Sequence, residues 1–215
     1  IVHLGPDASP VLEHFLDSTS NDLRFYATFT YSELPAPEPT LDILRQRLFD
    51  KDMQIRAVAR HAVARAWESD SFERKILLPM RGVIQASHND TSVEIAAHVL
   101  GRLRDGESIE ALIDNLEGYR SRTVQAIHTA LQRITLQPLP AASVAWRTWW
   151  SSAQEEDRRL WLLRAITSSS DALRAYVQEE LTMRRVPIEY RADAPSRERI
   201  AAQMQLKMWL KTNHV

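Results

Sequence analysis

The amino-acid sequence predicts an all-α protein, and its composition provides two observations for that prediction. The chain of 215 residues contains five glycines, whereas average usage would give about fifteen. Alanine and leucine, which favour helices, together number 49, and valine and isoleucine, which favour strands, together number 25. This composition indicates helices joined by short connections. The third observation is an internal repeat of helix pairs.

The repeat is a pattern in which an apolar residue is followed four positions later by a small one. It occurs four times, and its apolar residues, spaced by 32, 38 and 31 positions, are Leu23, Ile55, Val93 and Val124. Each belongs to the second helix of a pair, and the first helices are expected over residues 9–17, 41–49, 72–86 and 108–116. Pro79 is expected to kink or break the third of these first helices. Helix pairs repeated at this period are typical of an α-solenoid.

We therefore expect about four helix pairs followed by a C-terminal helical capping region, because the last repeat of a solenoid must cover its own apolar face. The predicted repeats are residues 1–35, 36–70, 71–105 and 106–137, and the cap is residues 138–215. The cap starts with a proline-containing linker and a tryptophan-rich helix. Further helices are expected over residues 154–167, 171–183 and 196–211, with an irregular connection over residues 184–194.

One segment carries a recognisable motif. Residues 52–59 read Asp-x-x-Ile-Arg-x-x-Ala, which resembles the second helix of HEAT repeats, particularly the short bacterial type grouped with the phycobilisome lyase HEAT-like repeats. The resemblance extends over roughly residues 4–136 and implies that the aspartate and arginine of each repeat stack as a ladder between neighbouring repeats. Glu94 and Gln125 replace arginine at the aligned positions, so the ladder is expected to be incomplete in the last two repeats.

The second helices of the predicted repeats also define a row of polar residues expected to face the concave surface of the solenoid. The row has mixed charge, which suits a protein or peptide partner better than a phosphate backbone. We therefore expect a non-catalytic scaffold that binds a protein or peptide partner. The residues of the row are Arg24, Thr28, Arg56, Arg60, Glu94, His98, Gln125, Thr129 and Gln132.

The tryptophan cluster has two interpretations. Trp146, Trp149 and Trp150 lie at helical spacing and, with Trp161, would form the hydrophobic core of the cap. Alternatively, Trp149 or Trp150 is partly exposed and anchors a partner, since tryptophan is enriched in the binding hot spots of interfaces. Helical periodicity alone does not distinguish these interpretations.

Several classes of protein are disfavoured. The chain has no cysteine, which excludes a disulfide scaffold, a thiolate zinc site and a cysteine nucleophile. The formal net charge of −1 argues against a dedicated nucleic-acid or anionic-membrane binder. No apolar run approaches the roughly 20 residues of a membrane span, so a cytoplasmic location is expected. Because the first residue is Ile, we expect one domain of a longer bacterial protein.

No catalytic residue, metal site or cofactor is expected. The glycines do not cluster into a phosphate-binding loop, and His61, His98 and His128 lack the spacing of metal ligands. His128 aligns with small residues of the other repeats; either it hydrogen-bonds against the cap or the predicted register is wrong by one. Two alternatives stay open: a HEAT-like enzyme, of the bilin lyase type or with another modifying activity, and a HEAT-like nucleic-acid-binding module.

Overall fold

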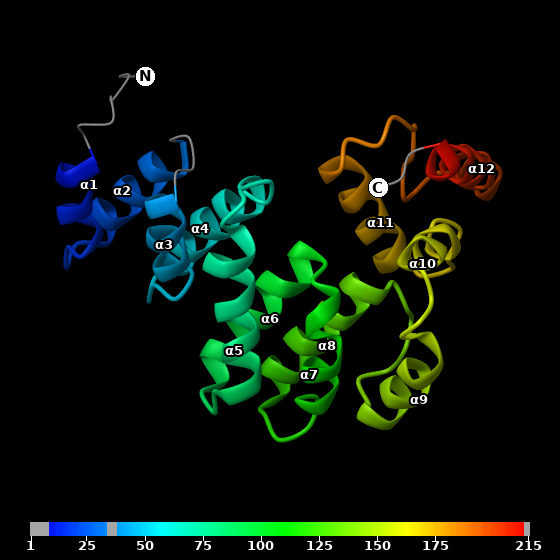
Figure 1. Ribbon diagram of the computed structural model, residues 1–215, viewed down its shortest axis with the longest axis horizontal. Coiled ribbons are helices and arrows are strands. Elements are labelled where there is room, and N and C mark those ends of the chain that lie inside the picture. Colours follow the sequence, from blue (N-terminus) through cyan, green and yellow to red (C-terminus); the bar gives the residue numbers. More distant parts are fainter. Residues whose placement is uncertain (1–8, 34–37, 213–215) are drawn as a thin grey trace. The chain divides into compact units, whose positions relative to one another are not determined.

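The computed structural model describes residues 9–33 and 38–212. Within those residues it contains twelve α-helices and two short irregular helices, and no strand (Figure 1). The prediction of an all-α protein is therefore confirmed. No helix in this described part is both long and apolar enough to cross a membrane. The chain divides into two compact units, residues 1–103 and residues 104–215.

The described part of the first unit consists of three helical hairpins, in each of which two successive helices pack together. The first irregular helix, η2, has π-helical geometry and leads directly into α5. The elements are α1 (Ser9–Leu16), α2 (Asn21–Glu33), α3 (Glu38–Arg47), α4 (Met53–Arg65), η2 (Glu73–Leu77), α5 (Leu78–Ala86) and α6 (Asp90–Leu103).

Pro79 distorts the helix that precedes α6, as predicted. It occupies the second residue of α5, immediately after η2. Proline has no backbone N–H and its ring displaces the carbonyl of the preceding turn, so it cannot continue a regular ladder of hydrogen bonds. The wider π turn at residues 73–77 is the local form that this disruption takes. The two segments together cover residues 73–86, close to the predicted helix over residues 72–86.

The second unit contains seven elements within residues 104–212. In the region assigned to the cap, α11 has the predicted bounds and α12 ends one residue later than predicted, whereas α10 is shorter than the helix expected over residues 154–167. The elements are η3 (Gly106–Ser108), α7 (Ile109–Asp114), α8 (Ser121–Thr135), α9 (Ser143–Ala153), α10 (Arg158–Ala165), α11 (Asp171–Met183) and α12 (Ser196–Thr212). The predicted boundary between repeats and cap, at residues 137–138, lies between α8 and α9 inside this unit.

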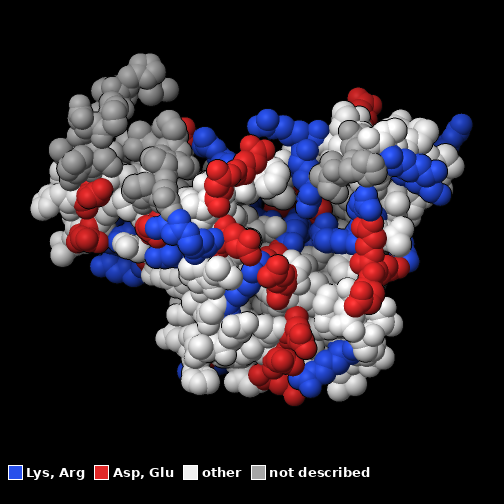
Figure 2. Space-filling view, viewed as in Figure 1, with Lys and Arg blue, Asp and Glu red and all other residues white. Residues whose placement is uncertain are grey.

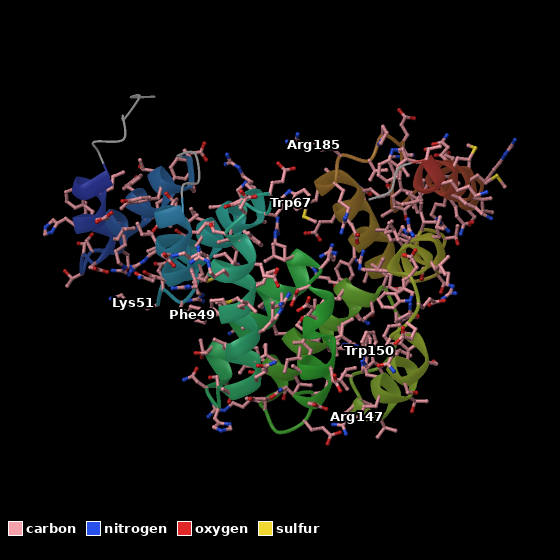
Figure 3. All side chains as sticks on the ribbon, in the orientation of Figure 1. Phe49, Lys51, Trp67, Arg147, Trp150 and Arg185 are labelled. Atoms are coloured by element: carbon pink, nitrogen blue, oxygen red, sulfur yellow. The ribbon has the colours of Figure 1, made fainter. Side chains whose placement is uncertain are left out.

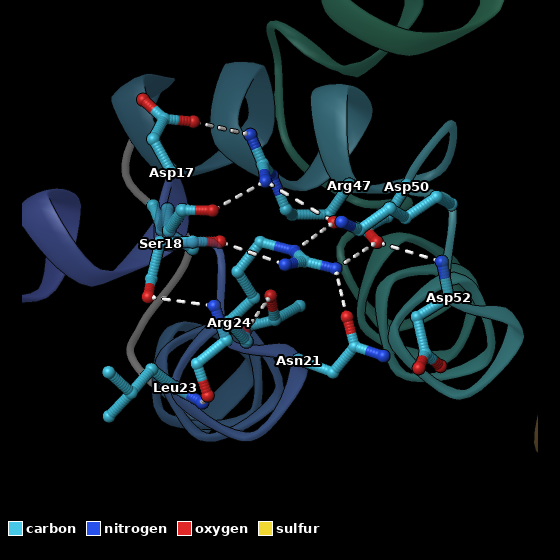
Figure 4. A network of polar contacts seen from close by, with 12 residues as sticks. Asp17, Ser18, Asn21, Leu23, Arg24, Arg47, Asp50 and Asp52 are labelled. Atoms are coloured by element: carbon cyan, nitrogen blue, oxygen red, sulfur yellow. Dashed lines mark hydrogen bonds and ion pairs between the residues drawn. The ribbon is translucent and has the colours of Figure 1, made fainter.

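The turn between α1 and α2 is held by a buried arginine, Arg24 (Figure 4). Its Nη1 atom donates to the carbonyls of Ser18 at 2.8 Å and Thr19 at 3.2 Å, six and five residues earlier in the chain. Its Nη2 atom donates to the side chain of Asn21 at 2.7 Å. These carbonyls follow the end of α1 and have no intrahelical N–H partner, so the guanidinium satisfies them.

The same arrangement occurs at two other turns. Arg56 Nη1 donates to the carbonyls of Asp50 at 2.7 Å and Lys51 at 3.0 Å. Arg174 Nη1 donates to the carbonyl of Ser168 at 2.7 Å, and its Nη2 pairs with Asp171. Arg24, Arg56 and Arg174, here called the turn-clamping arginines, are each the fourth residue of their helix.

The structure corrects the register of the predicted repeat. Leu23 and Ile55 are the third residues of α2 and α4, whereas Val93 and Val124 are the fourth residues of α6 and α8. Valine, rather than Glu94 or Gln125, therefore occupies the arginine position in α6 and α8. The prediction also missed Arg174, which lies in the region assigned to the cap.

Arg24 also connects two neighbouring hairpins of the first unit. Its Nε and Nη2 atoms donate to the carboxylate of Asp50, at 3.0 and 3.2 Å, in the turn between α3 and α4. Burial alone would raise the pKa of Asp50, but hydrogen bonds from Arg24 and the Asp52 amide bring it below its ordinary value. The aspartate of this pair is Asp50 in the turn, not Asp52 of the predicted motif, whose side chain caps α4 by accepting from the Gln54 N–H.

In the second unit a buried carboxylate, Glu180 on α11, binds several arginines at once. Arg158 donates to both of its oxygens, at 2.5 and 2.8 Å, and Arg184 Nε lies 3.2 Å from Oε1. The Nε atom of Arg104 lies 3.5 Å from Oε2. Burial alone would raise the pKa of Glu180, but Arg158 and the charges of Arg104 and Arg184 hold it below its ordinary value. The network joins α10 and α11 to the start of the unit.

Helix α11 ends in a Schellman motif whose left-handed residue is Arg185, labelled in Figure 3, with φ of 51°. Val186 N donates to the carbonyl of Leu181 and Arg185 N donates to that of Thr182. Arg185→Gly should raise the free energy of unfolding by about 1 kcal/mol, because glycine adopts this conformation without a Cβ clash. Urea unfolding measures the change. Arg185→Ala removes the same charge and keeps the clash; an equal gain in that variant would contradict the explanation.

The lowered pKa of Glu180 predicts how stability depends on pH. Its contribution is complete above the ordinary carboxyl pKa of 4.5 and is lost as the pH falls through the lower pKa of the folded state. Glu180→Gln should lower the free energy of unfolding at pH 7 by about 3 kcal/mol, and its stability should fall less between pH 5 and 3. Urea unfolding at both pH values tests this, with the exposed Glu155→Gln as control; an unchanged pH dependence in Glu180→Gln would refute it.

Candidate functional site on helices α4 and α6

Two residues of the predicted binding row are not on the surface. Arg24 is 4% exposed and Thr28 is fully buried. The guanidinium of Arg24 is occupied by the turn and by Asp50, and the hydroxyl of Thr28 donates to the carbonyl of Arg24 at 2.8 Å. The prediction that these two side chains face a partner is therefore wrong, because their polar atoms hold the helices of the first unit together.

Four other residues of the row lie on α4 and α6, which pack against each other in the first unit. Arg56 and Arg60 are one turn apart on α4, and Glu94 and His98 are one turn apart on α6. All four are half-buried. His98 Nε2 lies 4.0 Å from a carboxylate oxygen of Glu94. These four residues and Arg102, which continues the α6 row by one more turn, are called the α4/α6 site.

Arg60 is at the electrostatic centre of the α4/α6 site. Partial burial lowers the pKa of Arg60, the charges of Arg56 and Arg102 lower it further, and Glu94 acts in the opposite direction. The α4/α6 site therefore contains two further guanidinium groups and one carboxylate within electrostatic reach of Arg60. Such a cluster carries an excess of positive charge on a helical support.

The three arginines differ in what already binds them. Arg56 donates to the two carbonyls of the preceding turn. Arg60, in contrast, forms no hydrogen bond or ion pair with any residue in the described part of the chain. A half-buried guanidinium flanked by like charges is stabilised by an incoming anion, and a carboxylate matches its two parallel N–H donors. The α4/α6 site can thus accept a carboxylate at Arg60.

The remaining three residues of the row lie on α8 in the second unit. Gln125 is exposed, whereas Thr129 and Gln132 are half-buried. Gln125 Nε2 donates to the Thr129 hydroxyl at 3.4 Å, a long hydrogen bond. The prediction that these residues extend the binding surface of the first unit stays a prediction.

The tryptophans of α9 pack together and against α10. Trp146 is fully buried and donates to the carbonyl of Pro140 at 2.8 Å. Trp149 and Trp150, the latter labelled in Figure 3, are half-buried, with ring centroids 5.1 and 6.4 Å from that of Trp161. The rings therefore form a connected aromatic cluster, as the core interpretation expects. A further role of Trp149 or Trp150 as an anchor stays a prediction.

His128 has a structural role. Its Nε2 atom lies 2.7 Å from the carbonyl oxygen of Leu139, and its ring packs edge-on against Trp146 with centroids 6.1 Å apart. The hydrogen bond agrees with the first interpretation of His128, and the shifted register of α8 shows that the second one holds as well. Within the described residues, no three side chains of the His, Asp and Glu types are arranged to hold a metal ion.

Sequence reasoning missed Arg102, although a signal for it was present. Glu94, His98 and Arg102 are spaced by four residues along one face of α6. The predicted row takes two residues from α6, and one more turn of the same helix face adds the third guanidinium. A scan against models of protein families and a search among curated proteins found no match to this chain.

The two arginines at equivalent turns should differ in their effect on stability. Arg24→Met leaves the carboxylate of Asp50 buried with less compensation and should lower the free energy of unfolding by about 3 kcal/mol. Arg56→Met removes hydrogen bonds to turn carbonyls at a half-buried position and should cost about 1 kcal/mol. Urea unfolding of the two variants provides the comparison. Equal losses would show that the ion pair with Asp50 adds nothing to the clamp.

Proposed function

We propose that this chain is a non-catalytic helical-repeat scaffold that binds an acidic segment of a protein partner at the α4/α6 site. The observation that carries the proposal is Arg60, a half-buried guanidinium without a bonding partner in the described residues, between the charges of Arg56 and Arg102. Arg60 is half-buried, so part of its side-chain freedom is already lost before a carboxylate binds.

Mixed charge supports a protein partner over a nucleic acid. Glu94 is part of the α4/α6 site and would repel a phosphate backbone, which requires several basic contacts along its length. Acidic and basic side chains are interspersed over the face of the molecule in Figure 2, and the whole chain has a formal net charge of −1. Interfaces between proteins tolerate such mixtures, because opposite charges on the partner can pair with each sign.

We further propose that the helical hairpins belong to an α-solenoid of the HEAT type. The shared construction of their turns supports this proposal. In four hairpins, a side chain two residues before the helix cap accepts from the backbone N–H of that cap: Ser18 before α2, Asp50 before α4, Ser87 before α6 and Ser168 before α11. Repeated use of one turn is typical of arrays in which each unit contacts its neighbours.

The proposed binding site is tested with a matched pair of α4 variants. Arg60→Gln and Arg65→Gln each remove one positive charge, but Arg65 is an exposed residue that pairs with Glu33 at 3.1 Å. A fluorescent peptide of alternating glutamate and leucine serves as the probe, in an anisotropy titration at low salt. Arg60→Gln should weaken binding about tenfold, the effect of one lost charged hydrogen-bond donor, and Arg65→Gln should leave it unchanged.

A duplex DNA probe in the same titration distinguishes the alternative. Equal effects of the two variants would mean that the peptide responds only to total charge, and absence of peptide binding would remove the proposal. Tighter binding of duplex DNA, with a steep dependence on salt, would favour the nucleic-acid-binding module instead.

A further inference from the structure

The second unit contains an open pocket at which α10, the end of α11 and α12 meet. Its volume is about 560 Å³, which is within the range of small-molecule sites. One side of the pocket is charged and includes Arg158, Arg184 and Glu180. The other side is apolar and is formed by Leu162, Val186, Trp209 and Leu210.

Arg184 is anchored at one edge only. Its Nε atom lies 3.2 Å from Oε1 of Glu180, and 35% of its side chain is exposed. Its two Nη atoms have no acceptor among the residues that the structure describes. The guanidinium is thus fixed by Glu180, while the edge that carries both Nη atoms is available. That edge has the geometry of a bidentate carboxylate contact.

The carboxylates already present do not cancel this positive charge. Glu180 is 1% exposed and is shared by Arg158, Arg104 and Arg184. The other carboxylate lining the pocket, Asp157, pairs with Arg159, whose Nε donates to it at 2.6 Å. Arginine therefore outnumbers acid around the pocket, which favours an anionic ligand.

The apolar side selects for a ligand that is more than a simple anion. Leu162 and Val186 are buried in the core of the second unit, and Trp209 and Leu210 of α12 pack against the same core. A hydrocarbon chain or an aliphatic side chain in this pocket would lose contact with water against these residues. Inorganic phosphate would gain nothing from this side.

We propose that this pocket binds a carboxylate attached to an apolar body, with Arg184 as the bidentate contact and the Leu162–Val186–Trp209 side receiving the apolar part. A fatty carboxylate and the C-terminal residue of a peptide ending in an aliphatic side chain share this chemistry. The proposal concerns the second unit and is independent of the function proposed for the α4/α6 site.

Four probes in two matched pairs test the proposal: octanoate with octanol, and acetyl-leucyl-leucine with its C-terminal amide. Binding is followed by the two-dimensional NMR signal of the Trp209 indole N–H, assigned with Trp209→Phe. At least one of the two carboxylates should bind, and its uncharged counterpart should bind at least about tenfold more weakly. The carboxylate that binds more tightly shows whether the pocket prefers a fatty carboxylate or a peptide C-terminus.

Arg184→Gln has a close control in Arg185→Gln, since residue 185 does not line the pocket. Arg184→Gln should weaken carboxylate binding about tenfold, and Arg185→Gln should not, while the circular-dichroism spectra of both variants stay those of the unmodified chain. The proposal would be overturned if neither carboxylate bound, if the uncharged probes bound equally well, or if the two variants had equal effects.

Discussion

The structure depends on a requirement that applies to every helical hairpin: the carbonyls exposed where one helix ends must find donors before the next helix begins. Glycine commonly solves this problem by adopting a left-handed conformation that closes the last turn. This chain has five glycines, and at three of its hairpins an arginine on the following helix supplies the donors instead. Arg24, Arg56 and Arg174 each reach back to the turn from the fourth residue of their helix. The shortage of glycine is therefore linked to the use of arginine.

A turn that is held by a charged side chain also needs acceptors around that side chain. A guanidinium that loses contact with water must be fully paired, since an unpaired buried charge is strongly destabilising. Arg24 meets this condition through Asp50 of the next hairpin, and Arg174 through Asp171 and the carbonyl of Ala192, 2.7 Å from its Nε. Arg56 is half-buried, and among the described residues its guanidinium has only the turn carbonyls as partners. Burial of the clamp thus requires an acceptor from a later segment, which ties successive elements together.

Much of the fold could be predicted from sequence, because helix periodicity and capping residues are local signals. The helix over residues 171–183 has its predicted bounds, and Pro79 distorts the chain as expected. Burial is not a local signal, which explains the error at Arg24. Its sequence neighbours give no indication that the carboxylate of Asp50, 26 residues later, pairs with its guanidinium. Arg174 could have been found, since residues 168–174 repeat the Ser-x-Ser-(Asn/Asp)-x-Leu-Arg pattern of residues 18–24.

The α4/α6 site was predicted in part, because four of its members share helical spacing within two helices. The pocket of the second unit could not be predicted, since Arg158, Arg184 and Trp209 come from three separate segments that only the packing of α10, α11 and α12 unites. What distinguishes the proposed binding arginines from the clamps is the number of donors already used. Arg24 has acceptors on all three nitrogens, whereas Arg184 has an acceptor at Nε alone among the residues that the structure describes. A guanidinium fixed at one edge keeps its position and loses little further freedom when a carboxylate binds the other edge. Donors without an acceptor among the described residues are therefore the feature that the two proposed binding arginines, Arg60 and Arg184, share.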